Sequence, residues 1–152
     1  MALQIIAVGK KHESWVKDGI DRYEKRLKKP FMVVWQYLPH SAQSGNAARQ
    51  EESERLLARI KDSDFLILLD ERGKLLDSVA ASRQLLAPLE TGMSVVMVIG
   101  GAYGVSQAVQ ERADLVWSLS PLVFPHQLVR LVLIEQIYRM QEIATGRPYH
   151  HL

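Results

Sequence analysis

A glycine-rich segment directly follows an apolar stretch in the second half of the chain. Residues 95–99 are all apolar, and Gly100, Gly101 and Gly104 come after them. In an open α/β sheet, ligands bind beyond the carboxyl ends of the strands, and glycine there lets a ligand approach the backbone closely. The segment therefore predicts a ligand site, although a tight strand-to-helix turn without a ligand fits the same residues. It is no dinucleotide fingerprint, because the pattern is G-G-x-x-G and residues 115–134 contain no acidic residue.

A second candidate site lies in a loop that two prolines bracket. Pro121 and Pro125 enclose three apolar residues, and His126 follows at the expected start of a helix. Because proline fixes φ, we expect a stiff apolar loop that could form a slot for a flat ring. His126 could act there as an acid, a base or a hydrogen-bond donor, although a lone histidine is more often structural. It has no histidine or carboxylate partner at ligand spacing, so we expect no metal site.

The last residues of the chain, G-R-P-Y-H-H-L, form the third candidate. Gly146 can end the preceding helix, and Pro148 stiffens the segment after it. Tyrosine, arginine and histidine can stack on a nucleobase and form hydrogen bonds with it. Against a functional role stands the tendency of chain termini to fray.

Length and composition restrict the class of protein. The 152 residues are 47% apolar and 24% charged, which predicts one globular domain over residues 1–152. The absence of cysteine excludes disulfides, thiolate zinc sites and cysteine nucleophiles. The first apolar run, residues 2–8, is too short to span a membrane, and we expect a cytoplasmic protein. Residues 1–30 carry eight basic and four acidic groups, which favours contact with a phosphate backbone, unless they only form a solvated helix face.

Hydrophobic patterning predicts the elements that hold these candidates in place. Strands are expected at residues 3–8, 31–38, 65–69, 94–99 and 115–119, with a turn at 70–74. Helices are expected at residues 15–27, 47–61, 79–90, 107–112 after a Ser106 cap, and 126–145. This alternation predicts an α/β fold with a mostly parallel sheet and helices on both faces. The last helix is apolar on more than one side, so we assign part of it to a homodimer interface; the alternative is a central core helix of a monomer.

Taken together, the segments resemble the small SPOUT-class RNA methyltransferases, specifically the bacterial family that methylates N3 of a pseudouridine in large-subunit ribosomal RNA. The resemblance covers essentially the whole chain. It is carried by I-A-V-G-K at residues 6–10, Y-E-K-R-L at 23–27, I-G-G at 99–101, F-P-H-Q at 124–127 with Arg130, E-Q-I-Y-R at 135–139, and Tyr149-His150. The chain departs from the family pattern at Val123, where threonine is usual, and at Met140, where alanine is common.

The resemblance implies an S-adenosylmethionine-dependent enzyme with a C-terminal trefoil knot, acting as a homodimer on large-subunit ribosomal RNA within the assembled ribosome. The implied cofactor site comprises Leu69, Gly100, Gly101, Leu119, Ser120, Pro121, Leu122, Val123 and Phe124. The groups implied for orienting the base and stabilising charge are His126, Arg130, Tyr149 and His150, with no general base assigned. Two alternatives stay open: a ribosome-associated RNA-binding module without catalysis, and an α/β nucleotide-binding enzyme of another activity.

Overall fold

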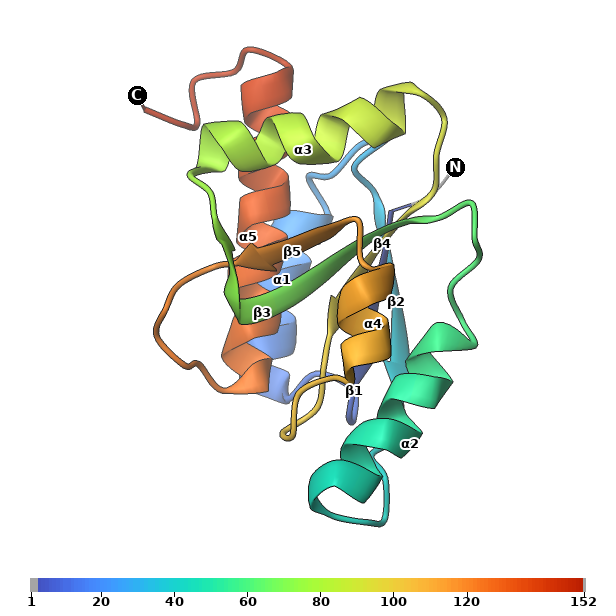
Figure 1. Ribbon diagram of the computed structural model, residues 1–152. Coiled ribbons are helices and arrows are strands. Elements are labelled where there is room, and N and C mark those ends of the chain that lie inside the picture. Colours follow the sequence, from blue (N-terminus) through green and yellow to red (C-terminus); the bar gives the residue numbers. More distant parts are fainter. Residues whose placement is uncertain (1–2, 152) are drawn as a thin grey trace.

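The computed structural model describes residues 3–151, in which five strands form a parallel sheet of order β2-β1-β4-β3-β5 (Figure 1). The strands are β1 (Leu3–Val8), β2 (Val33–Leu38), β3 (Phe65–Leu75), β4 (Val95–Ile99) and β5 (Leu115–Ser118). The helices are α1 (Ser14–Glu24), α2 (Gly45–Leu57), α3 (Ser78–Glu90), α4 (Gln107–Arg112) and α5 (His126–Ala144). Because the strands run in the same direction, their carboxyl ends meet at one edge of the sheet.

Helices cover both faces of the sheet, which confirms the α/β prediction. Alternate residues of a strand point to opposite faces, and β1 shows the consequence. Ile5 and Ala7 pack in one apolar cluster with residues of α1, α3 and α5. Ile6 and Val8 pack in a second cluster with residues of α2 and α4. Burial on both faces explains why the strands read as continuous apolar runs rather than as alternating ones.

Helix α5 is the central element of the first layer, where it packs against both α1 and α3 (Figure 1). Leu133, Ile134 and Ile137 are fully buried in this layer. The side-chain amide of Gln141 also fixes the segment after α1: it accepts a hydrogen bond from Lys28 N at 2.7 Å and donates one to Arg26 O at 3.0 Å. This explains much of the apolar character of α5 without a partner subunit.

The turn expected at residues 70–74 is wrong, because β3 continues to Leu75. Leu69 and Lys74 are both paired with Trp117 of β5, so that the residues between them bulge out of the ladder. A Cβ at Gly73 would lie 2.7 Å from the backbone of Val116, which is why the polar segment can return to the strand only with glycine there. The charged residues at 70–74 suggested a turn, but pairing with β5 keeps this segment in the sheet.

Most other boundaries agree with the sequence to within two residues. Ser106 caps α4 as expected, since its Oγ accepts a hydrogen bond from Val109 N at 3.4 Å. Helices α1 and α2 end earlier than predicted, at Glu24 and Leu57, and α1 is followed by short turns rather than by a further helical turn. None of the described helices is long and apolar enough to cross a lipid bilayer.

Candidate functional site

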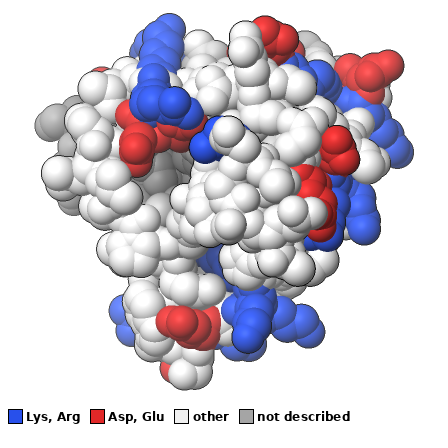
Figure 2. All heavy atoms as spheres, turned by 60° about the horizontal axis from the view of Figure 1, so that its bottom comes forward, with Lys and Arg blue, Asp and Glu red and all other residues white. Residues whose placement is uncertain are grey.

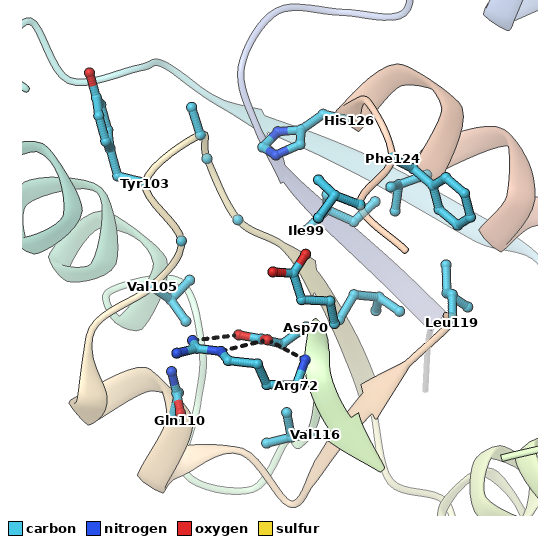
Figure 3. Close-up of a pocket in the computed structure, with 18 of the residues that line it drawn as sticks. Asp70, Arg72, Ile99, Tyr103, Val105, Gln110, Val116, Leu119, Phe124 and His126 are labelled. Atoms are coloured by element: carbon cyan, nitrogen blue, oxygen red, sulfur yellow. Dashed lines mark hydrogen bonds and ion pairs between the residues drawn. The ribbon is translucent and has the colours of Figure 1, made fainter. Parts of the chain in front are cut away.

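A cavity of about 930 Å³ opens beyond the carboxyl ends of β3, β4 and β5 (Figure 3). Both segments that the sequence singled out contribute to it, together with the end of β3. Of the residues expected to hold a cofactor, the cavity is lined by Leu69, Gly100, Gly101, Leu119, Ser120, Leu122, Val123 and Phe124. Pro121 belongs to the same loop but does not line the cavity. His126 lines it as well, so these distant segments of the sequence surround a single space.

The glycine turn brings backbone to the wall of the cavity. A Cβ at Gly100 would lie 2.9 Å from Val105 Cγ1, and one at Gly101 would collide with Oε1 of Glu52. Gly104 has a φ of +76° and closes the turn by donating its N–H to Gly101 O at 3.0 Å. A side chain at position 100 or 101 would clash with Val105 or Glu52, and the positive φ of position 104 favours glycine there.

The loop at residues 119–124 forms an apolar wall that hydrogen bonds of two serines keep in shape. Ser118 Oγ donates to Ser120 O at 3.0 Å, and Leu122 N donates to Ser120 Oγ at 3.0 Å. Leu119 and Phe124 lie together on one side of the cavity (Figure 3). Leu122 and Val123 are 68% and 77% exposed, which is unusual for apolar side chains beside a cavity and fits a surface that a ligand covers.

Sequence reasoning missed the polar groups on the β3 side of the cavity. Asp70 accepts hydrogen bonds from Arg72 N at 2.8 Å, Nη2 at 3.1 Å and Nε at 3.2 Å (Figure 3). Burial raises the pKa of Asp70, but the hydrogen bonds and charge of Arg72 outweigh burial and hold the pKa below its ordinary value. Arg49 of α2 lines the cavity too, and its Nε donates to Tyr103 O at 2.8 Å. The position of Asp70 just beyond a run of buried strand residues was the available signal.

His126 is the first residue of α5, and its ring lies beside the glycine turn (Figure 3). Burial lowers its pKa, and so do the positive charge of Arg130 and the neighbouring His40, while Glu52 acts in the opposite direction. The ring is therefore uncharged near neutral pH, when it can accept one hydrogen bond and donate another.

Arg130 does not line the cavity, because its side chain is only 1% exposed. Its Nη1 donates to Lys10 O at 2.8 Å and lies 3.4 Å from Nδ1 of His12, and its guanidinium lies over the ring of Tyr37 at 5.6 Å. The contacts connect α5 to the β1–α1 loop. Arg130 therefore holds the β1–α1 loop against α5 at the edge of the site.

Within the described residues, Tyr149 and His150 of the tail are held against α5. Tyr149 donates its hydroxyl hydrogen to Glu135 Oε1 at 3.3 Å, and Nδ1 of His150 lies 3.0 Å from Nη1 of Arg139. Arg139 also binds Glu135 and lies over the Tyr149 ring at 4.8 Å. Glu135 follows His126 by nine residues, which is about 13 Å along a helix. Tyr149 and His150 therefore do not lie at the cavity of their own chain.

A separate groove of about 460 Å³ runs between α1 and α5. Its apolar residues from α5 are Leu128, Leu131 and Val132, which are only half-buried. Gly19 of α1 faces them, and a Cβ there would lie 2.8 Å from Leu131 Cδ1. This is the side of α5 that the helices of the same chain leave open.

Charge is distributed unevenly over the edge of the sheet at which the cavity opens. Figure 2 views the molecule from that side and shows charged groups of both signs at the margins, with a broad uncharged area between them. Among residues 3–151, no cluster of three or more histidine, aspartate or glutamate side chains could hold a metal ion.

Comparison with known proteins links this arrangement to one family. The sequence model of a family described as predicted SPOUT methyltransferase matches residues 1–150. Similar proteins include those of Thioalkalivibrio sulfidiphilus, 38% identical over 154 residues, Acetivibrio thermocellus, 39% over 158 residues, and Streptococcus mutans, 40% over 158 residues. In each case 99% of both chains is covered, and each relative is named ribosomal RNA large subunit methyltransferase H.

Proposed function

The chain belongs to the SPOUT methyltransferase family, and from that premise we propose that it transfers a methyl group from S-adenosylmethionine to N3 of a pseudouridine in large-subunit ribosomal RNA. The observation that carries the proposal is the single cavity formed by Leu69, the glycine turn and the 119–124 loop. These segments are far apart in the sequence, yet all three surround the same space. Relatives named for this class of RNA match the chain from end to end.

The cavity fits S-adenosylmethionine in size and in chemistry. Gly100 and Gly101 line the cavity, where a nucleoside can hydrogen-bond their backbone, and the Leu119–Phe124 wall suits the face of an adenine ring. Asp70 adds a carboxylate that can accept hydrogen bonds from hydroxyl groups. The bound cofactor supplies a methyl group activated by a sulfonium. We further propose that the chain around this cavity forms the trefoil knot implied by the family resemblance.

The residues beside the cavity suit the handling of a uracil-like ring. Most of the rate enhancement available for methyl transfer comes from holding the nucleophile in line with the methyl group. His126, uncharged near neutral pH, can hydrogen-bond a ring edge without repelling the cationic cofactor. Arg130 acts as a positioning residue, since its guanidinium holds Lys10 and His12 rather than facing the cavity.

We propose that the working enzyme is a homodimer with a shared site. Tyr149 and His150 contact Glu135 and Arg139, and Glu135 is about 13 Å along α5 from His126, yet both tail residues are well suited to contact a base. The open groove between α1 and α5 gives a second subunit an apolar surface to cover. In such a dimer the tail of one subunit would complete the cavity of the other.

The exposed basic residues after α1 are the proposed contact with ribosomal RNA. Lys25, Arg26 and Lys28 are exposed, and the Gln141 amide holds the backbone that carries them. Phosphate contacts of this kind supply affinity without choosing a sequence, so they would orient the RNA across the dimer. We propose that this RNA lies within the assembled ribosome.

Two measurements test the proposal. Calorimetry with S-adenosylmethionine should show binding, which neither a non-catalytic RNA-binding module nor a nucleotide-binding enzyme of another activity predicts. Tritiated S-adenosylmethionine should then label large-subunit RNA of ribosomes lacking the modification, with the methyl group mapped to a pseudouridine by mass spectrometry. Absence of cofactor binding, or a label on another base, would overturn the assignment.

A further inference from the structure

Glu52 carries a buried carboxylate next to the glycine turn. Glu52 lies on α2, is 3% exposed, and its Oε1 has no hydrogen-bond partner among the described residues. A buried unsatisfied carboxylate oxygen is costly, so a functional reason for it is to be sought. Oε1 lies against Gly101, which lines the cavity and has no Cβ to displace it. The carboxylate thus lies directly behind the glycine turn.

The other oxygen of Glu52 faces the loop after β2. Oε2 accepts a hydrogen bond from Ser41 N at 2.9 Å and lies 4.0 Å from Nδ1 of His40. The His40 side chain is 53% exposed and lies next to the cavity rather than among its lining residues. The hydrogen bond from Ser41 N therefore ties the loop after β2 to Glu52, and His40 of this loop lies beside the Glu52 carboxylate.

The opposite nitrogen of His40 lies above the end of β1. Nε2 is 3.1 Å from the position that a Cβ of Gly9 would occupy, and Nη2 of Arg130 is 3.4 Å from the same point. Gly9 has a φ of +128°, where glycine is strongly favoured. The charge of His40 also lowers the pKa of His126 across the cavity edge. His40, His126 and Arg130 therefore surround the same corner of the site.

Building on the proposed function, we propose that His40 is the general base that removes the N3 proton, and that Glu52 is its positioning residue. Nδ1 of His40 lies 4.0 Å from Oε2 of Glu52. We assign the ring hydrogen to Nδ1 on that side, which leaves Nε2 as the proton acceptor. An anion within about 4–6 Å stabilises the imidazolium that forms. Burial and the charge of Arg130 lower the pKa of His126, and Glu52 offsets them only in part, so His126 serves as the hydrogen-bonding partner instead.

N3–H gives its proton to Nε2 of His40, and the electron pair left on N3 forms the bond to the methyl carbon. The bond from that carbon to the sulfonium sulfur breaks, and its electron pair stays on sulfur. The products are the N3-methylated base, S-adenosylhomocysteine and a His40 imidazolium, which returns its proton to water.

Single-turnover methyl transfer to ribosomal RNA, with the full-length enzyme, tests the role of His40. We expect His40→Gln to lower the rate by about 10²-fold, the low end for a lost general base, while the calorimetric Kd for S-adenosylmethionine stays within about twofold. His40→Gly should be equally slow and should recover rate as imidazole is added. Gln43→Ala, an exposed change in the same loop, should keep the wild-type rate. A wild-type rate for His40→Gln, or no response of His40→Gly to imidazole, would overturn the role of His40.

A double-mutant cycle separates the positioning role of Glu52 from support of the glycine turn. Glu52→Gln keeps the shape of the side chain and should lower the rate by about tenfold in the wild-type background. In the His40→Gly background the same change should have no further effect, because Glu52 acts through the missing ring. An equal loss in both backgrounds would show that Glu52 only supports Gly101. If the wild-type enzyme leaves ribosomal RNA unmethylated, the proposed function fails. If the wild-type enzyme methylates the RNA and the His40 variants keep its full rate, only the role of His40 fails.

Discussion

At the scale of single residues, Gly100 gives the most direct test of the cavity. A Cβ there would lie 2.9 Å from Cγ1 of Val105, which also lines the cavity, so the larger valine side chain would displace this part of the cavity wall. We expect Gly100→Val to raise the Kd for S-adenosylmethionine by at least about 10²-fold, measured by calorimetry. The circular dichroism spectrum should stay unchanged, because the turn is at the surface end of β4. Retained cofactor affinity would show that the cavity is not the cofactor site.

A second prediction for a single residue concerns His12, whose protonation makes the free energy of unfolding depend on pH. Burial, followed by the charge of Arg130, lowers the pKa of His12 from 6.5 to about 4. Between these two pH values the unfolded chain binds more protons than the folded one, so the free energy of unfolding falls as the pH drops through the window. We expect His12→Gln to make this fall less steep in urea unfolding at a series of pH values. The exposed His151→Gln should keep the wild-type slope, and an unchanged slope in His12→Gln would contradict the assignment.

At the scale of elements, the proposed RNA contact of the segment after α1 can be tested through the salt dependence of RNA binding. Replacing Lys25, Arg26 and Lys28 by glutamate should weaken binding to ribosomal RNA and make the plot of log affinity against log salt shallower by about 2, because phosphate contacts release counterions. Filter binding at several salt concentrations measures both effects. The reversed residues are exposed, and Gln141 holds this segment through backbone atoms alone, so the fold should persist.

The matched control for that experiment uses three exposed basic residues on other elements. Arg59, Lys61 and Arg83 lie after α2 and on α3, away from the segment that follows α1. Reversing them changes the net charge by the same amount. If both triple variants lose affinity equally, the effect comes from overall charge and the segment after α1 has no special role.

At the scale of the whole molecule, complementation between two inactive variants tests the shared site. Deleting residues 147–152 should leave cofactor affinity intact and lower methyl transfer by at least about 10²-fold. Gly100→Val should be inactive through loss of cofactor. In a mixed dimer, the deleted subunit offers an intact cavity and the Gly100→Val subunit offers an intact tail, so methyl transfer should reappear when the two are refolded together. No recovery in purified mixed dimers would place the tail and cavity in one chain, and an active monomer would remove the shared site altogether.

The sequence by itself determined most of the elements and two of the segments that line the cavity. Apolar runs and helical spacing act locally, so strands such as 3–8 and 95–99 could be predicted closely. Glycine and proline restrict or free the backbone wherever they occur, which made the 100–104 turn and the 119–124 loop recognisable. The family resemblance depends on the same segments, and the match over residues 1–150 agrees with it.

Tertiary structure alone decided which distant side chains meet. The strand order brings β3, β4 and β5 together, and only this places Asp70 in the cavity and keeps residues 70–73 in a bulged strand. It also buries Glu52 behind Gly101 and holds Tyr149 on α5, far from His126 of the same chain. Such contacts depend on chain crossings and packing between elements many residues apart. Local pattern carries no information about them, because a polar residue gives the same sequence signal on a solvated helix face as it does beside a cavity.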